Sequence, residues 1–179
     1  MSLASNCFDV SQDQPRNLAK LQKLSLDDKI LYSSVKIKEF YIATKGKTYV
    51  SYSGGKDSTV LLHLVRSIYP DTPAMFVDTG LEFPEIRDQV RITENVDWVK
   101  PTKNFKQVIE EYGYPCIGKV ASHWIHLAQN GAPSGIRQMN AETKFGFKRY
   151  AYMVDAPFKV SEHCCDVMKK SPAKRYYKQ

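Results

Sequence analysis

Thr48-Tyr49-Val50-Ser51-Tyr52-Ser53-Gly54-Gly55-Lys56-Asp57-Ser58 joins two different structural patterns. The residues before the glycines are mostly β-branched or aromatic, which is typical of a strand. Thr59 to Tyr69 follow with apolar side chains at helical spacing, and Pro70 ends that pattern. The segment therefore predicts a strand at 48–52, a glycine-rich loop and a helix at 59–69.

The flanking sequence extends this pattern into a strand–helix–strand unit. The run 74–77 is continuously apolar, as in a strand buried on both faces, so residues 48–78 have about the length of a right-handed crossover between parallel strands. Similar patterns predict helices at 25–43 (capped by Ser25), 84–93, 104–112, 119–129 and from Ser161 to about Lys170, a strand at 97–99 and a loop at 130–149.

The loop Ser53–Ser58 has the composition of an anion-binding site. We expect Gly54 and Gly55 to adopt positive φ, so that main-chain N–H groups and the positive end of the following helix face one point. Ser53 and Ser58 add hydroxyl groups and Lys56 adds a positive charge. Neither a Walker A motif nor a G-x-G-x-x-G fingerprint is present. The loop therefore predicts a phosphate or sulfate site of another kind.

A second polar segment, Asp78-Thr79-Gly80, follows the strand at 74–77. In a parallel sheet the carboxyl ends of neighbouring strands lie at one edge, where ligands bind, so we expect Asp78 near the glycine-rich loop. The alternative is that Asp78 only forms a turn through its own side chain.

Composition limits the classes of function. The net charge of +7 favours an anionic partner, either a nucleotide or a nucleic acid, and the basic, tyrosine-containing stretches 144–152 and 169–178 are either part of such a contact or a solvated surface. No apolar run approaches the roughly 20 residues of a membrane span, and no signal peptide is visible, so we expect a cytoplasmic protein without a membrane partner. Residues 1–24 are expected to form an N-terminal arm, followed by one domain at 25–179.

The glycine-rich stretch 49–64, the stretch Val77-Asp78-Thr79-Gly80-Leu81-Glu82-Phe83-Pro84-Glu85 and the Cys164-Cys165 segment through Pro172 together resemble the phosphoadenosine phosphosulfate reductase family. That family belongs to the adenine nucleotide alpha-hydrolase, or PP-loop, superfamily. The resemblance implies a Rossmann-like α/β fold with a parallel sheet and helices on both faces. It also implies that the chain binds an adenylyl sulfate nucleotide and that the activated sulfate is reduced to sulfite by thiol chemistry.

The resemblance also implies roles for individual residues. Ser53–Ser58 would hold the phosphosulfate or pyrophosphate, and main-chain groups of Ser51 and Tyr52 would hold adenine. Asp78, Thr79 and Gly80 would lie by the nucleotide. Lys169 and Lys170 match basic residues near the substrate's sulfate. A thiol reductant such as thioredoxin and a second copy of the chain are expected partners.

The chain departs from the family pattern in its cysteines. The family's C-terminal Glu-Cys-Gly-x-His segment is absent, so the C-terminal part of the family is expected to be missing and the catalytic residue is not identified. Relatives with a four-iron cluster combine a Cys-Cys motif, which Cys164-Cys165 matches, with a later Cys-x-x-Cys. Here the other two cysteines are Cys7 and Cys116, at a different spacing. We therefore expect no iron–sulfur cluster unless further ligands are supplied.

Two other functions are compatible with the loop. An ATP pyrophosphatase would bind ATP there, with magnesium near Asp57, and would adenylate an acceptor, for example during sulfur modification of a nucleic acid. A nucleotide sensor without catalysis is the third possibility. His123 and His126, three residues apart on a predicted helix, suggest either a metal site or ordinary packing, and His163 precedes Cys164, whose thiolate it could activate.

Overall fold

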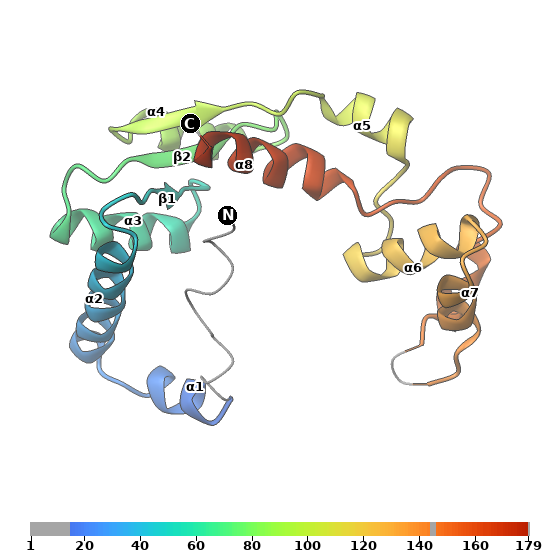
Figure 1. Ribbon diagram of the computed structural model, residues 1–179, viewed down its shortest axis with the longest axis horizontal. Helices are drawn as coiled ribbons and strands as arrows, with labels where there is room; N and C mark the ends of the chain where they lie inside the picture. Colours follow the sequence, from blue (N-terminus) through green and yellow to red (C-terminus); the bar gives the residue numbers. More distant parts are fainter. Residues whose placement is uncertain (1–14, 144–145, 179) are drawn as a thin grey trace. The chain divides into compact units, whose positions relative to one another are not determined.

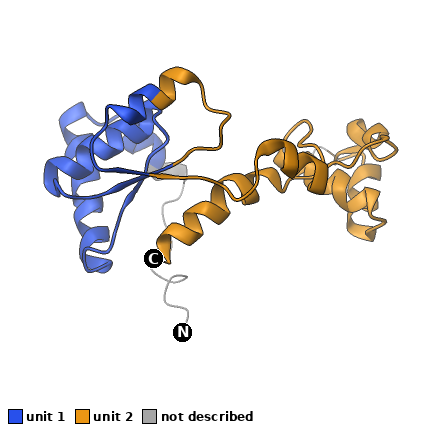
Figure 2. Cartoon of the chain, turned by 90° about the horizontal axis from the view of Figure 1, so that it is seen from above, with its two compact units in different colours: residues 1–76, 88–97 blue, residues 77–87, 98–179 orange. Residues whose placement is uncertain are grey.

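The computed structural model describes residues 15–143 and 146–178. Its contacts divide the chain into two compact units, which Figure 2 shows in different colours. The first unit consists of residues up to 76 together with 88–97, and the second consists of 77–87 and 98–179. Each unit is described by itself below.

The sheet has three strands, β1 (Val50–Ser51), β2 (Ala74–Val77) and β3 (Val96–Val99), in the order β1-β2-β3 (Figure 1). β1 pairs in parallel with β2, and Val50 lies opposite Ala74. The β2–β3 hydrogen bonds advance equally along both strands, from Ala74 N–H to Asn95 O and from Asp78 N–H to Val99 O, so this pair is also parallel. The predicted α/β class with a parallel sheet is confirmed.

Helices connect these strands in the predicted order. α3 (Lys56–Ile68) joins β1 to β2, and α4 (Pro84–Arg91) joins β2 to β3. α2 (Leu26–Ala43) begins after Ser25, whose Oγ accepts a hydrogen bond from the Asp28 N–H as predicted. α1 (Pro15–Gln22) lies within the expected N-terminal arm, whose first 14 residues are outside the described range.

The core of the first unit surrounds β1 and β2. β2 is buried along most of its length, which explains its continuous apolar run. α3 directs Leu62 and Val65 inward, whereas α2 has no buried residue and packs against α3. The buried hydrophobic residues of this unit are Val50, Tyr52, Leu62, Val65, Ala74, Met75, Phe76 and Val90.

The second unit is mainly helical. Its core lies between α6 (Lys119–Gln129), α7 (Pro133–Asn140) and Val160, with Ile125 fully buried at the centre. α5 (Phe105–Tyr112) begins at a capping box formed by Asn104 and Gln107. The remaining elements are a 3-10 helix at Lys148–Met153, a π-helix at Asp166–Lys170, α8 (Ser171–Tyr177) and a parallel bridge between Tyr114 and Val160.

The prediction of a loop at 130–149 was wrong, because α7 and the start of the 3-10 helix lie there. Pro133 opens α7, where its missing N–H costs nothing. Gly135, which suggested a loop, instead permits close contact with α6: a Cβ at Gly135 would lie 2.4 Å from the Ala128 nitrogen. Composition alone could not reveal this packing.

The prediction that Pro172 ends the last helix was also wrong. Helical structure continues to Tyr177, and Pro172 is buried in the first turn of α8. The preceding turn is a π-helix, in which the Ser171 N–H bonds to the Asp166 carbonyl. The wider π turn changes the hydrogen-bonding register just before the proline ring, so the chain remains helical there.

Among the described residues, no helix is both long enough and apolar enough to cross a membrane.

The contact at Gly135 can be tested by Gly135→Ala. We expect the free energy of unfolding to fall by about 1–3 kcal/mol, because the new methyl group would force the α6 and α7 backbones apart. Gly118→Ala is the control, since a Cβ at Gly118 meets no atom within 4 Å. Urea unfolding monitored by circular dichroism measures both changes, and equal stability of the two variants would contradict the packing.

Candidate functional site

The glycine-rich loop connects β1 to α3 and forms a main-chain concavity. Gly54 has φ of 71°, but Gly55 is extended at φ −81° and caps α3, so only one of the two glycines adopts the predicted positive φ. The helix begins at Lys56, three residues earlier than predicted. Its first internal hydrogen bond is the Thr59 N–H to the Gly55 carbonyl. The N–H groups of Lys56, Asp57 and Ser58 therefore point out of the start of the helix, an arrangement that suits an anion.

The two loop serines stabilise this conformation. Ser58 Oγ donates to the Gly55 carbonyl at 2.9 Å and accepts the Ser53 main-chain N–H at 3.2 Å. Ser53 Oγ lies 3.0 Å from Ser58 Oγ. The serine hydroxyls, which the sequence predicted as donors to an anion, thus make hydrogen bonds that fix the conformation of the loop. Lys56 and Asp57 are exposed at the start of α3.

β1, the strand that leads into this loop, carries main-chain groups that its pairing with β2 does not use. In the parallel ladder, Val50 N–H bonds to Pro73 O and Tyr52 N–H bonds to Met75 O, both toward β2. Successive residues of a strand face opposite edges, so the N–H and C=O of Ser51 point away from β2. The β1–β2 pairing therefore leaves the Ser51 main-chain groups on the outer edge of β1, whereas it engages the Tyr52 N–H.

Tyr52 is a structural residue of the first unit. Its ring is 2% exposed, and its hydroxyl lies 3.4 Å from Thr59 Oγ1 and 3.3 Å from Thr93 Oγ1. Burial raises the pKa of this hydroxyl, but the hydrogen bonds with Thr59, Thr93 and Gln89 and the charge of Arg66 together outweigh burial, and the pKa is lowered. The side chain thus links α3 to the segment that follows α4.

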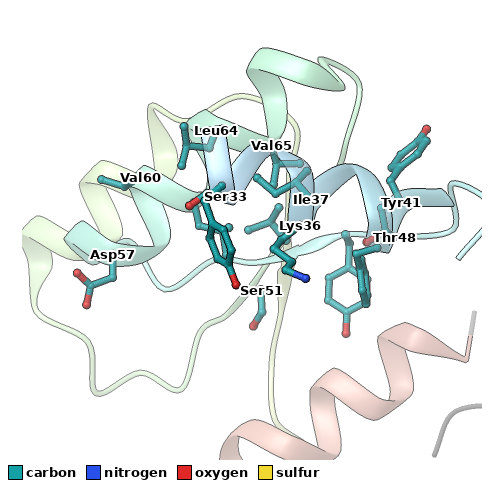
Figure 3. Close-up of a pocket in the computed structure, with 15 residues that line it drawn as sticks. Ser33, Lys36, Ile37, Tyr41, Thr48, Ser51, Asp57, Val60, Leu64 and Val65 are labelled. Atoms are coloured by element: carbon teal, nitrogen blue, oxygen red, sulfur yellow. The ribbon is translucent and has the colours of Figure 1, made fainter. Parts of the chain in front are cut away.

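A cavity of about 540 Å³ lies beside Ser51 in the first unit (Figure 3). Its walls come from α2, the outer edge of β1 and α3, and sequence reasoning missed it because α2 carried no recognisable motif. The lining side chains are largely apolar and aromatic. They are Tyr32, Ser33, Lys36, Ile37, Phe40 and Tyr41 on α2, Thr48–Ser51 on the strand segment, and Asp57, Val60, Leu61, Leu64 and Val65 on α3.

Asp78 and its neighbours form a rigid turn after β2. Asp78 is 5% exposed; its Oδ1 accepts the Gly80 N–H at 3.1 Å, and its Oδ2 pairs with Arg87 at 3.1 Å. Thr79 is held in turn by Glu82, which accepts both its N–H and its hydroxyl. Gly80 has a φ of 79°. These contacts match the turn-forming alternative, and Arg87 is a partner that the sequence gave no signal to find.

Cys164 and Cys165, considered as cluster ligands, and the two lysines predicted near a substrate's sulfate lie in the second unit. Cys164 and Cys165 are unpaired, half-buried thiols in the helical turn before Asp166. Lys170 pairs with Asp166 at 2.6 Å, and this hydrogen bond raises the pKa of Lys170, while Lys169 is exposed. The two adjacent cysteines and the two lysines thus share one continuous helical segment.

The histidines of α6 hold the chain that leads to this segment. His126 Nδ1 lies 3.0 Å from the Val160 carbonyl, and His123 Nδ1 lies 2.8 Å from Glu162 Oε1. Burial raises the pKa of Glu162, but the hydrogen bond with His123, a main-chain hydrogen bond and the nearby charges of His163 and His123 together outweigh burial, so the Glu162 pKa is lowered. Between these contacts, Gln129 bonds to the carbonyl groups of Met153 and Phe158 and to the Val160 N–H. Packing, the alternative to a metal site, accounts for both histidines.

The described residues do not fit a four-iron cluster. Such a cluster needs four thiolates, and the described range supplies only Cys164, Cys165 and Cys116. Burial raises the pKa of the Cys116 thiol, which opposes the thiolate that iron requires. Within this range, no group of three or more His, Cys, Asp or Glu side chains is arranged to hold a metal ion.

Fold and loop together define a Rossmann-like α/β protein with a glycine-rich loop at the carboxyl end of its first strand. Residues 47–116 match the family model described as the phosphoadenosine phosphosulfate reductase domain. The predicted resemblance to the phosphoadenosine phosphosulfate reductase family of the PP-loop superfamily is confirmed for this segment.

Several curated proteins are similar over part of the chain. A Methanocaldococcus jannaschii protein named only as uncharacterised is 36% identical over 105 residues, which cover 55% of this chain and 24% of that protein. Sulfate adenylyltransferase subunit 2 of Buchnera aphidicola is 44% identical over 55 residues, covering 27% of this chain and 18% of the relative. Phosphoadenosine 5'-phosphosulfate reductase of Salmonella newport is 36% identical over 67 residues, covering 37% and 25%. The chain therefore matches about a quarter or less of each relative's length.

The ion pair between Asp78 and Arg87 predicts that Asp78→Asn lowers the stability of the fold substantially. Asparagine preserves the bond to Gly80 but leaves Arg87 without its counter-charge, so we expect the free energy of unfolding to fall by about 2 kcal/mol, less than for a fully buried pair because Arg87 is 35% exposed. Asp88→Asn removes an exposed pair with Arg91 and should cost less than about 0.5 kcal/mol. Urea unfolding of both variants at neutral pH measures the difference, and equal losses would contradict a supporting role for Asp78.

Iron analysis tests the mismatch between the thiols and a cluster. Protein purified without oxygen should contain much less than one iron per chain and should show no broad visible absorbance, because the thiols of the described residues number fewer than the four that a cluster needs. Mass spectrometry after alkylation should then show that Cys164 or Cys165 has reacted. About four irons per chain, accompanied by acid-labile sulfide, would show that the expectation is wrong.

Proposed function

We propose that this protein binds an adenylyl sulfate nucleotide at the Ser53–Ser58 loop and serves in the reduction of the activated sulfate to sulfite. The observation that carries the proposal is the main-chain concavity formed by Gly54 and the first turn of α3, within a segment of the phosphoadenosine phosphosulfate reductase family. Donors fixed before the ligand arrives stabilise the charge of phosphate or sulfate without reorganisation.

The outer edge of β1 supports an adenine ligand. Adenine presents a ring nitrogen that accepts and an amino group that donates, side by side. The Ser51 N–H and C=O offer the matching donor and acceptor on the unpaired edge of the strand. Apolar side chains such as Val60 and Leu61 line the adjacent cavity and are suited to the faces of the base. Guanine would place an oxygen acceptor opposite the Ser51 carbonyl and would bind less well.

The reduction requires two thiols. A thiolate attacks the sulfur of the nucleotide, the bond between that sulfur and the bridging phosphate oxygen breaks, and adenosine phosphate leaves with the electron pair. A second thiol then attacks the resulting thiosulfonate, so that sulfite leaves and a disulfide forms. We propose that a thiol reductant such as thioredoxin supplies these electrons. Lys56 and the loop N–H groups would stabilise the charge on the leaving phosphate.

A second candidate is adenylyl transfer with ATP as the substrate. Its support is the similarity to sulfate adenylyltransferase subunit 2, which is the highest identity among the relatives named above. The same loop would then hold the pyrophosphate of ATP, with magnesium near Asp57, while an acceptor takes the adenylyl group. The acceptor could be a base of a nucleic acid undergoing sulfur modification, which would suit the positive net charge.

Lys56→Ala tests the loop directly. A charge-assisted contact with a phosphate contributes about 1.5–3 kcal/mol, so nucleotide affinity should fall roughly tenfold to a hundredfold. Lys106→Ala is the control, because Lys106 is an exposed lysine on α5. Calorimetric titration with adenosine 5'-phosphosulfate, 3'-phosphoadenosine 5'-phosphosulfate and magnesium-ATP measures each affinity.

The same titrations separate the candidates. Sulfite release in the presence of a thiol supports the reductase, and release of pyrophosphate and AMP from ATP supports the second candidate. Unchanged affinity of the Lys56 variant, or no binding of any of the three nucleotides, would overturn the assignment of the loop.

A further inference from the structure

A second cavity, of about 550 Å³, lies within the second unit, where the ends of α5 and α6 meet the segment that leads to Cys164. Sites for small molecules typically have volumes of about 300–1,000 Å³. Four of the side chains that line this cavity carry flat rings, namely Tyr112, His126, Phe158 and His163. A lining of this composition suits a flat heteroaromatic ligand, and the function proposed above makes no use of it.

Hydrogen bonds hold the wall of this cavity in place. Gln129 bonds to the Phe158 carbonyl at 3.0 Å and to the Val160 N–H at 2.8 Å. His126 Nδ1 lies 3.0 Å from the same Val160, at its carbonyl. α6 therefore fixes the backbone that carries Phe158 and Lys159, so the cavity exists before a ligand arrives and little conformational entropy is lost on binding.

Other polar groups of the lining remain available to a ligand. Within the described part of the chain, the ring nitrogens of His163 make no hydrogen bond, and the ring contacts Tyr112 and His126 only edge to face, at 5.5 and 5.6 Å between centroids. Asn130 uses its amide nitrogen on the His126 carbonyl at 2.7 Å, which leaves its amide oxygen to accept. Imidazole and amide groups both match the donors and acceptors on the edge of a nucleobase.

The positive charge of the chain is concentrated in the same part of the sequence. Residues 98–179 contain 14 Lys or Arg and six Asp or Glu, whereas residues 1–97 contain 12 and 13. At the cavity, Lys159 is exposed, and Glu111, the one carboxylate in a lining that lies wholly within the described residues, is paired with Lys103. A nucleic-acid strand carries a phosphate for every base, so this excess of charge favours a strand over a free nucleotide.

We propose that this cavity receives an unpaired base of a single-stranded nucleic acid. The base stacks against Phe158 and bonds through its edge to His163, while Lys159 contacts the phosphates of the strand. A base within a duplex is stacked and paired, so it cannot enter, and the site selects single strands. The site lies in a different unit from the Ser53–Ser58 loop and does not depend on the nucleotide proposed there.

Fluorescence anisotropy with a labelled single strand of mixed-sequence DNA, compared with its duplex, tests the site. The single strand should bind at least tenfold more tightly than the duplex. Phe158→Leu keeps an apolar side chain but removes the ring, so it should weaken binding of the single strand about tenfold to a hundredfold. Tyr152→Leu is the matched control, because Tyr152 is 69% exposed in the same unit and lies outside the cavity, and it should change affinity less than twofold.

A second pair of variants tests the phosphate contact without touching a ring. Lys159→Met should reduce the slope of log affinity against log salt concentration by about 0.7, the value for one phosphate contact on a single strand. Lys106→Met should leave the slope unchanged, since Lys106 is an exposed lysine of the same unit outside the cavity. Both lysines are exposed, so neither change threatens the fold.

Four outcomes would overturn the proposal. They are failure of the single strand to bind, equal affinity for single strand and duplex, equal losses in Phe158→Leu and Tyr152→Leu, and a salt slope that Lys159→Met leaves unchanged. Displacement of the strand by adenosine 5'-phosphate at a comparable concentration would show that a free nucleotide is the occupant, and it would overturn the assignment to a strand. None of these outcomes bears on nucleotide binding at the Ser53–Ser58 loop, which the Lys56 variant measures.

Discussion

The parallel pairing of β1 with β2 is the constraint on which the candidate site depends. In its register, the Tyr52 N–H bonds to Met75 O. The main-chain N–H groups of Val50 and Tyr52 therefore point toward β2, and the main-chain groups of Ser51 point to the outer edge of β1. A shift by one residue would exchange these orientations, exposing the Tyr52 main chain and burying that of Ser51. The same pairing places the glycine-rich loop after the carboxyl end of β1, where the dipole of α3 adds to its donors.

Around this pairing, side chains that look suited to binding mainly fix the backbone. Ser53 and Ser58 bond to each other and to the loop, and Asp78 bonds to its own turn and to Arg87. The proposed function therefore assigns ligand binding to main-chain N–H groups and to a few exposed charges such as Lys56. A site of this kind is rigid before the ligand arrives, so little conformational entropy is lost on binding.

The second unit is organised by side-chain contacts to a loop rather than by a sheet. Gln129 and His126 on α6 hold the backbone of residues 153–160, and His123 holds Glu162 just beyond. These contacts fix the course of the chain into the helical segment that carries Cys164 and Cys165. The histidines that suggested a metal site therefore serve the geometry of a distant segment.

The amino-acid sequence by itself determined the local features: the apolar run of β2, the Ser25 cap of α2, the loop with its two glycines, and the family of residues 47–116, because each depends on neighbours in the chain. It did not determine α7, the helix through Pro172, the Arg87 partner of Asp78, or the cavity beside α2. Each of these depends on contacts between segments far apart in sequence. The sequence pattern indicates a loop at Gly135, whereas the structure packs this residue against α6. It likewise indicates an ordinary exposed lysine at Lys36, whereas the structure places this residue in the lining of a cavity beside the edge of β1.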